Sequence, residues 1–290
     1  MASDGKKQAK IWDFFKQTKG EKSVLTAKGE HGMVVKDAIK EEPIPSSHNA
    51  KESRKIKLLW QNINIATYNI ESTRGTRLQE VAIEAQNEGV DILICIGTRS
   101  NYSGDGFVGA FKTYYEGHGT TGTELMTGIC VLVNKKLYTK GTYDRKWVTM
   151  NGRILMIRLK NTVVDITIIG AYAPGDHLSR ELRHTFWKSL KQGVKEIPKR
   201  STKIMGIDAN GHIGRDGMGG IGEAGQERWT NNGHDLERVI NNSSMTALNT
   251  QSNCKNPGWT WQRRDGIAKG RIDYLAVETS VGKQRGHGFA

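Results

Sequence analysis

From about residue 57 to the end of the chain, short apolar runs alternate with polar segments. Each run has the length of a β-strand and is rich in isoleucine and valine, as expected for strands buried in a sheet. The runs are INIATYNI, VDILICIG, TGICVLVN, RILMIRLK, VVDITIIGAYAP, TKIMGIDAN and GRIDYLAV. Several of them follow one another with only short connections, which favours two packed sheets.

Three of the intervening segments repeat apolar residues at helical spacing. They are residues 77–89, 179–197 and 232–245. The first ends in Gly89, a typical C-terminal cap. The second has four apolar residues on one face: Leu182, Phe186, Leu190 and Val194. Strands outnumber helices, so the pattern predicts an α/β fold in which two packed sheets carry helices on their outer faces.

Residues 1–56 differ from the rest of the chain. They are polar, with more basic than acidic residues, few aliphatic runs and the stretch EEPIPSSHNAKES. Such a sequence buries too little apolar surface to fold alone. We therefore predict a flexible basic tail over residues 1–56 and one domain over residues 57–290.

The charge balance narrows the choice of partner. Lysine and arginine outnumber aspartate and glutamate 43 to 30, a formal net charge of +13. This excess suits a polyanion, nucleic acid first and an anionic membrane second, although a basic protein without such a partner has the same balance. No segment approaches the roughly 20 apolar residues of a membrane span, and the polar start MASDGKKQAK is unlike a signal peptide. We expect no membrane association.

The three cysteines, Cys95, Cys130 and Cys254, lack the spacing of a zinc site. Two of them lie in apolar runs, so we expect buried free thiols. This pattern indicates a reducing compartment, the cytosol or the nucleus.

One candidate catalytic pair is Asp208 and Asn210, at the end of the run TKIMGIDAN. Positions two apart in a strand point to one side, so the carboxylate and the carboxamide would project into one site. A carboxylate can take a proton from attacking water and an amide can orient a phosphate oxygen, which suits phosphodiester hydrolysis. Taken alone, the pair is equally typical of a turn.

Three further segments carry candidate residues, two of them at strand ends and the third within a strand. TYNIESTR places Asn69 and Glu71 two apart, followed by Arg74. Amide and carboxylate oxygens are ligands that Mg²⁺ prefers, and an arginine suits a phosphate. Tyr172, in AYAPGD, can hydrogen-bond a phosphate oxygen, and Asp273, in GRIDYLAV, needs a partner such as histidine or an amide if it is buried. The alternatives are an ordinary strand-end turn for TYNIESTR and a buried tyrosine at the rim of a sheet for Tyr172.

In their order along the chain, TYN, GICVLV, GRILMI, AYAP, IDAN and RIDY resemble the motifs of the endonuclease/exonuclease/phosphatase family, metal-dependent phosphodiesterases that include DNase I. The resemblance covers roughly residues 57–290. DANGHIG followed by NNGHDLERVINNSSMTALNT is most similar to the endonuclease domains of non-LTR retrotransposons. The resemblance implies a four-layer α/β sandwich of two packed mixed sheets flanked by helices. It also implies a DNA endonuclease that depends on Mg²⁺ or Mn²⁺.

The resemblance assigns catalytic roles to four residues. Asp208 would activate the attacking water, and Asn210 would position the phosphate. Tyr172 would contact the phosphate, and Asp273 would orient the family's catalytic histidine.

The resemblance also assigns the metal to Asn69 and Glu71, and Arg74 and Arg99 are candidate phosphate contacts. Two positions depart from the family pattern. Gly97 stands in VDILICIGTRS where the family has a glutamate that binds the metal, and no Ser-Asp-His occurs before the ending GHGFA. We expect weak or absent activity and a missing final strand. A C-terminally truncated enzyme, a degenerate transposon copy, and a divergent enzyme that uses Glu71 and Asp208 alone are three explanations.

The segment QAKIWDFF in the tail matches the pattern of peptides that bind the sliding clamp PCNA. Its defining positions are Gln8, Ile11, Phe14 and Phe15. One helical turn would place the three apolar side chains on one side as a plug, while the glutamine reaches a separate polar pocket. A short amphipathic helix that packs on the domain is the alternative. Binding to the clamp would place the protein in the nucleus.

The leading functional hypothesis is a DNA endonuclease, monomeric apart from the clamp. The second is a catalytically impaired relative that binds DNA and PCNA, favoured by Gly97 and the missing Ser-Asp-His. The third is a phosphatase acting on lipids or nucleotides. The basic charge balance favours nucleic acid over a small phosphorylated lipid.

Overall fold

The computed structural model describes residues 63–117, 127–139, 141–150, 152–215, 218–224, 228–252, 259–262 and 268–280. The predicted tail with its clamp-binding segment, Cys254 and the last residues, 281–290, lie outside the described residues.

The first sheet has five strands in the order β1-β2-β5-β4-β3. Its strands are β1 (Ile65–Asn69), β2 (Ile92–Ile96), β3 (Gly104–Val108), β4 (Phe111–Glu116) and β5 (Ile129–Asn134). β1 and β2 are parallel because helix α3 (Arg77–Asn87) connects them, and the other pairs are antiparallel. The 3-10 helix η1 (Lys135–Leu137) follows β5.

The second sheet has six strands in the order β10-β13-β9-β8-β7-β6. Its strands are β6 (Tyr143–Met150), β7 (Ile154–Lys160), β8 (Asp165–Tyr172), β9 (Thr202–Asp208), β10 (Met245–Ala247) and β13 (Asp273–Glu278). β8 and β9 are parallel across helix α4 (Arg180–Glu196), and the other pairs are antiparallel. Helix α5 (Asn231–Asn242) and the 3-10 helix η2 (Leu248–Thr250) flank β10, and β11 (Trp261–Gln262) pairs with β12 (Lys269–Gly270) as a separate hairpin.

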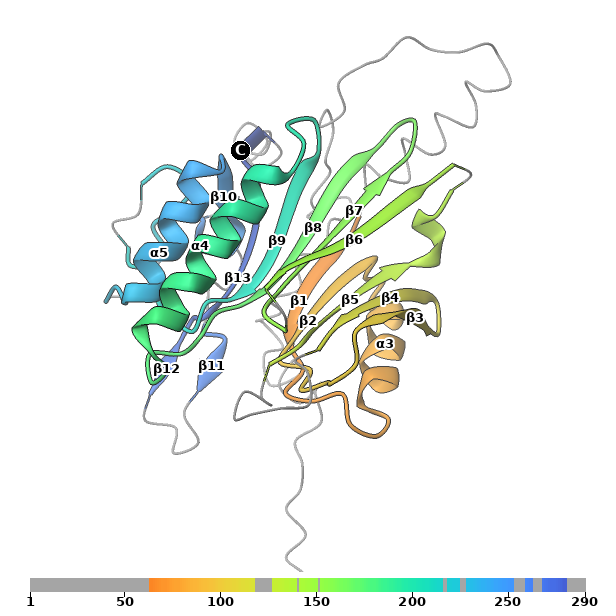
Figure 1. The fold of residues 1–290 in the computed structure, drawn as a ribbon, viewed down its shortest axis with the longest axis horizontal. Coiled ribbons are helices and arrows are strands. Elements are labelled where there is room, and N and C mark those ends of the chain that lie inside the picture. The colour runs from red at the N-terminus through yellow and green to blue at the C-terminus, as the bar shows by residue number, and fades with distance from the viewer. Residues whose placement is uncertain are drawn as a thin grey trace, which may run out of the picture.

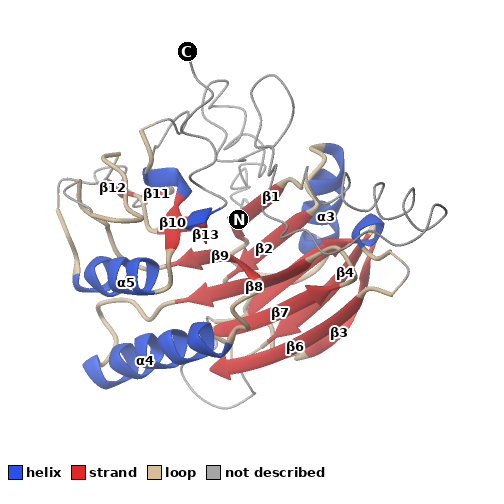
Figure 2. Cartoon of the chain, turned by 90° about the horizontal axis from the view of Figure 1, so that it is seen from above, coloured by secondary structure: helices blue, strands red, loops and turns tan. Residues whose placement is uncertain are grey.

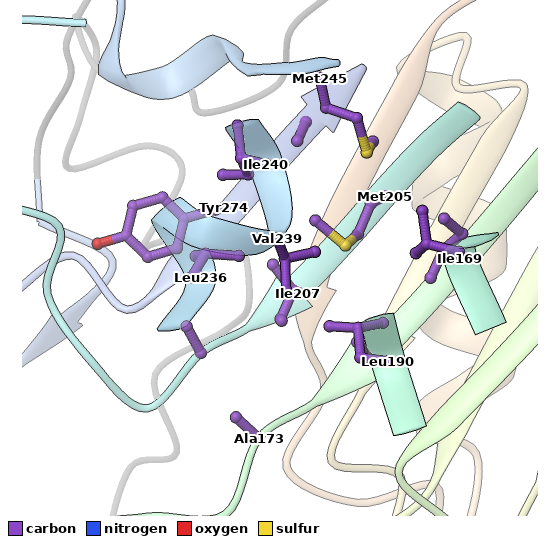
Figure 3. Packing of buried hydrophobic residues seen from close by; sticks show 14 of the residues in the cluster. Ile169, Ala173, Leu190, Met205, Ile207, Leu236, Val239, Ile240, Met245 and Tyr274 are labelled. Carbon is purple, nitrogen blue, oxygen red and sulfur yellow. The ribbon is translucent and has the colours of Figure 1, made fainter. Parts of the chain in front are cut away.

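The sheets and helices form four layers, as predicted. α3 covers the outer face of the five-stranded sheet, while α4 and α5 cover the outer face of the six-stranded sheet (Figures 1 and 2). Each interface between layers has its own core of buried apolar residues. In the core under α4 and α5, the ring of Tyr274 lies beside Leu236 of α5 (Figure 3). Both sheets are mixed, so the fold is the DNase I-like α/β sandwich.

The central core between the sheets contains two glycines on paired strands, Gly170 of β8 and Gly206 of β9. A Cβ atom at Gly170 would lie 2.7 Å from Cγ2 of Ile129, and one at Gly206 would lie 2.9 Å from both Cδ1 of Ile94 and Oγ1 of Thr67. The two glycines therefore let the sheets approach closely, one alternation below the strand ends that carry the candidate site.

Cys95 and Cys130 are buried free thiols, as predicted. Within the part of the chain that the structure describes, no helix combines the length and the apolarity that a membrane span requires.

Candidate active site

Three candidate side chains lie on one rung of the six-stranded sheet. Tyr172 of β8 pairs with Asp208 of β9, and Asp208 pairs with Asp273 of β13. Partners on neighbouring strands point to the same face of a sheet. That face is the inner one, since Ile204 and Leu275 of the same strands belong to the core between the sheets. The phenol and the two carboxyl groups therefore lie side by side at one end of the strands, where β8 and β9 end and β13 begins.

The other sheet supplies Asn69, the last residue of β1. Its Nδ2 donates a hydrogen bond of 3.1 Å to Oδ2 of Asp208, and its Oδ1 accepts one of 3.2 Å from the backbone N–H of Glu71. One carboxamide thus joins the two sheets and fixes the orientation of the buried carboxyl group. The close approach at Gly206 makes this bond possible, because β9 carries both residues.

Asn210 holds the loop that follows β9. Its backbone N–H donates to Oδ1 of Asp208 at 2.9 Å, and its Nδ2 donates to the carbonyl oxygen of Ala173 at 2.8 Å. Asn232, buried at the start of α5, donates to the carbonyl oxygens of Pro174 and Asn210 at 2.8 and 3.3 Å. Both carboxylate oxygens of Asp208 therefore accept an N–H, and the loops after β8 and β9 are joined to α5.

Three non-glycine residues at the site have a positive φ: Glu71 (59°), Arg99 (51°) and Asn210 (45°). The sequence predicts that Glu71 and Asn210 point to the site through the alternation of a strand. This reason is wrong, because β1 ends at Asn69 and β9 ends at Asp208. A left-handed turn places them instead. Residues in this conformation are uncommon and cluster at functional sites, because the surrounding structure has to hold them there.

The two carboxyl groups have raised pKa values. Asp208 is 1% exposed, and burial, followed by the negative charge of Asp273, holds its pKa well above the usual range. Burial raises the pKa of Asp273 to about 6, against the opposing effect of a hydrogen bond with Thr260. Carboxyl groups with strongly shifted pKa values are typical of catalytic sites, although ionisable groups paired for structural reasons show the same shifts.

Asp273 is positioned by the segment before the hairpin. Oγ1 of Thr260 accepts the backbone N–H groups of Ile272 and Asp273 at 3.0 and 3.1 Å. Oδ1 of Asp273 is buried and has no hydrogen-bond partner among the described residues. The sequence predicts that this carboxylate needs a histidine or an amide, and that need is unmet within the described part of the chain.

Basic side chains surround Tyr172. The guanidinium of Arg153 lies 6.0 Å from the centre of its ring and donates to its carbonyl oxygen at 3.3 Å. Burial raises the pKa of Tyr172, and Arg153 and Arg99 are close enough to oppose that rise. Arg99 is exposed, as is Arg74 on the loop after β1. Arg99 thus lies beside the rung, whereas Arg74 is placed only on the same loop as Glu71.

Gly97, where the family pattern has glutamate, lies directly against Asn69. Its φ is +72°, and a Cβ atom there would lie 2.9 Å from Oδ1 of Asn69. The carboxamide of Asn69 therefore occupies the space into which a side chain at position 97 would extend.

The donor set fits a magnesium ion that has few protein ligands. Within the described residues, no three His, Cys, Asp or Glu side chains converge as a metal-binding group. Mg²⁺, however, commonly binds one or two carboxylates, completed by waters and substrate phosphate. Glu71 is exposed and Oδ1 of Asn69 has a second lone pair, so these two residues fit such an ion.

Three residues that build the site were not among the sequence-predicted site residues. Arg153 is 3% exposed beside Tyr172, Asn232 ties the loops together, and Thr260 positions Asp273. A signal existed for Arg153, since an arginine precedes a strongly apolar strand in GRILMI. Asn232 and Thr260 act through long-range contacts that local sequence does not reveal.

At the level of sequence, the chain has only distant relatives among the known proteins found by comparison. No family model matches the chain. Craniofacial development protein 2 from Bos taurus is 22% identical over 77% of the chain, and that from Tragulus javanicus is 21% identical over 80%. The chain covers 37% and 40% of these two proteins, about two fifths of their length.

Two solved structures have a similar fold. One is the endonuclease domain of TRAS1, a telomere-specific non-LTR retrotransposon, with a TM-score of 0.52 and 14% identity over 74% of this chain and 85% of that one. The other is the 3′ phosphatase NExo from Neisseria bound to a product DNA hairpin, with a TM-score of 0.50 and 14% identity over 74% and 86%. At this identity the likeness concerns the fold.

Proposed function

We propose that this site hydrolyses DNA phosphodiesters as a Mg²⁺- or Mn²⁺-dependent endonuclease of the retrotransposon type. The observation that carries the proposal is the rung of Tyr172, Asp208 and Asp273, joined across the sheets to Asn69. A buried carboxylate held by two N–H donors beside a phenol is suited to proton transfer next to a phosphate. The DNA-related names of the two similar structures agree with this choice of substrate.

In this mechanism Asp208 acts as the general base. The hydrogen bonds from Asn69 and from the backbone of Asn210 fix the orientation of its carboxylate. Because its pKa is raised, the ionised form is a stronger base than an ordinary aspartate. Asp208 takes the proton of the attacking water as the water oxygen bonds to phosphorus. The bond from phosphorus to the leaving sugar oxygen breaks, and that oxygen takes a proton from solvent. The second N–H of the Asn210 amide and the hydroxyl of Tyr172 donate to phosphate oxygens as negative charge develops there.

The metal would be held by Glu71 and the amide oxygen of Asn69. When bound, it neutralises phosphate charge and favours the ionised form of the attacking water. The exposed Arg99 and Arg74 contribute phosphate contacts at the rim.

The test is a nicking assay of the full chain on supercoiled DNA with Mg²⁺, and again with Mn²⁺. Because Gly97 removes a metal ligand, we expect weak metal-dependent nicking, which Asp208→Ala abolishes and Asp105→Ala, at an exposed position on β3, leaves unchanged. Nicking that survives Asp208→Ala would exclude the proposed base.

A second candidate function is DNA binding without efficient hydrolysis, and Gly97 favours it. The missing carboxylate removes one metal ligand, and loss of a direct ligand is expected to exceed the 10–100-fold effects of residues around the ligands. Under this alternative the wild-type chain and Asp208→Ala bind duplex DNA equally and neither nicks it. A lipid or nucleotide phosphatase is the third alternative, and it predicts turnover of such substrates without competition by duplex DNA.

We also propose that residues 8–15 recruit the protein to PCNA, with Gln8, Ile11, Phe14 and Phe15 as the contacts, and that the protein works in the nucleus. The support is the match of all four positions in a basic, polar segment. Calorimetry of a peptide of residues 5–20 with PCNA measures this directly. We expect binding that Phe14→Ala with Phe15→Ala removes and Lys16→Ala retains. No binding by the unchanged peptide would end the proposal.

A further inference from the structure

The outer surface of α4 carries a row of basic side chains, Arg180, His184, Lys188, Lys191 and Lys195. At 3.6 residues per turn these five positions fall within an arc of about 80° around the helix. Four of the side chains are exposed and that of Lys191 is half-buried. We call this row the α4 stripe.

The charge of the α4 stripe is largely unneutralised. Glu181 and Glu196 are the acidic residues of α4, and both lie outside the arc. Among the described residues, the stripe forms one ion pair, between Lys191 and Asp235 of α5 at 4.0 Å. The apolar face of α4 is buried in the core with Phe186 and Leu190, so the stripe is the face left to solvent.

The stripe begins at the end of the molecule that carries the candidate site. α4 follows Tyr172 after a short loop, and its first turn lies at the same end as the hairpin of β11 and β12 (Figure 1). From Arg180 to Lys195 the helix rises about 22 Å. The stripe is therefore a straight basic track that leads away from the site over the outer layer.

The positive charge is not spread evenly over the fold. α3, on the opposite outer face (Figure 2), has Glu80 and Glu84, with Glu88 directly after it at the same four-residue spacing, and one basic residue, Arg77. The two outer helical layers therefore differ in charge, and a polyanion is attracted more strongly to the α4 side. The excess of basic residues in the chain as a whole does not by itself produce this asymmetry.

We propose that the α4 stripe binds the phosphate backbone of duplex DNA beyond the segment that enters the site. This inference rests on the proposed function for the identity of the polyanion. An anionic membrane fits less well, because a membrane-binding helix offers lipid an apolar face, and that of α4 is buried. A second copy of the chain fits less well, because the acidic row of α3 extends only about 12 Å and the net charge of +13 opposes self-association.

The test measures binding of a fluorescent 30-base-pair duplex to the full chain over a range of salt concentrations. The stripe variant is Lys188→Gln with Lys195→Gln, and the matched control is Lys135→Gln with Arg145→Gln. Both remove two charges from exposed positions, but the control positions lie on η1 and β6. Each phosphate contact contributes about 0.9 to the slope of log affinity against log salt. We therefore expect the stripe variant to lower the slope by about 2 and the control to leave it unchanged.

Equal slopes for the stripe variant and the control would overturn the inference. Stripe-dependent binding to phosphatidylserine vesicles that exceeds binding to DNA would overturn it in favour of a membrane, and stripe-dependent self-association in ultracentrifugation in favour of a second copy. Asp208→Ala separates the two proposals: it is expected to abolish nicking and to keep the wild-type slope. Nicking by Asp208→Ala would reject the role of Asp208 as general base. The salt slopes of the stripe variant and the control would still test DNA binding by the α4 stripe.

Discussion

At the scale of residues, the carboxyl groups of Asp208 and Asp273 oppose folding at neutral pH. They lie on paired positions of β9 and β13. Asp208 is buried, Asp273 is half-buried with its Oδ1 covered, and the charge of Asp273 disfavours ionisation of Asp208. The N–H groups of Asn69 and Asn210 donate to the Asp208 carboxylate and offset part of the free-energy cost of burying its charge. Oδ1 of Asp273 has no such donor among the described residues. Asp273 is therefore the group whose removal changes stability most predictably.

We expect Asp273→Asn to stabilise the protein at pH 7 and to flatten its pH dependence. The folded-state pKa is raised from 3.8 to about 6, so the folded protein holds a proton that the unfolded chain releases. Stability therefore falls as the pH rises from about 4 to about 6, by roughly 1.4 kcal/mol per unit, and the asparagine variant escapes this loss. Urea unfolding at pH 4, 5, 6 and 7 measures it.

The control for this prediction is Asp105→Asn, at an exposed position on β3. It is expected to keep the wild-type pH profile. A profile of Asp273→Asn that runs parallel to wild type would show that Asp273 is ionised in the folded protein at low pH, and the inferred cost of burial would be wrong.

Gly97 and Gly75 separate backbone strain from collision at the site. Both have a positive φ, +72° and +63°, but a Cβ atom at Gly75 meets nothing within 4 Å, whereas one at Gly97 lies 2.9 Å from Oδ1 of Asn69. We expect Gly75→Ala to cost about 1 kcal/mol, the strain of a left-handed alanine. Gly97→Ala should cost more and should also impair nicking, because Asn69 has to leave Asp208. Equal free energies of unfolding for the two variants would contradict this account.

At the scale of elements, strands with a continuous apolar run were predictable, and short strands or strands with many polar residues were not. The seven apolar runs became β1, β2, β5, β7, β8, β9 and β13, and the predicted helix at residues 77–89 is α3, with Gly89 in the left-handed conformation after it. Of the described strands, six were missed, including the short strands β11 and β12 of the hairpin. In the two sheets, β3 and β6 are edge strands, β10 has three residues, and β4 has as many polar residues as aromatic ones. Such strands lack the continuous apolar run that identifies a strand buried on both faces.

The start of α4 provides a prediction at this scale. Oγ of Ser179 accepts the backbone N–H of Leu182 at 3.1 Å, so it caps the helix that carries the basic stripe. We expect Ser179→Ala to lower the free energy of unfolding by about 1 kcal/mol. Thr185→Ala, at an exposed position within α4, is the control and should be neutral or slightly stabilising, because alanine favours helix. A loss equal to that of the control would show that the cap contributes nothing.

At the scale of the whole molecule, the candidate site exists because two sheets meet. Asn69, Tyr172 and Asp208 were identified at the ends of apolar runs and Asp273 within one, but their convergence depends on pairing between β8, β9 and β13 and on contact with β1. No local pattern specifies that contact. The glycines under the rung do, since Gly206 leaves room for Ile94 and Thr67 of the opposite sheet.

This dependence makes Gly206→Ala a test of how the site is assembled. Its Cβ atom would lie 2.9 Å from Cδ1 of Ile94 and 3.1 Å from its Cβ, so the sheets have to separate by a few tenths of an ångström. Overpacking of this kind typically costs 1–3 kcal/mol. The separation also lengthens the bond from Asn69 to Asp208, so nicking should fall beyond what the loss of stability explains.

Gly106→Ala is the matched substitution on an edge strand. Gly106 lies in β3, and a Cβ atom there meets Oγ1 of Thr113 at an ordinary 3.7 Å. It should leave both urea unfolding and nicking near wild type. If Gly206→Ala behaves like Gly106→Ala in both measurements, the two sheets can accommodate a methyl group at position 206. The hydrogen bond between Asn69 and Asp208 then does not depend on the glycine.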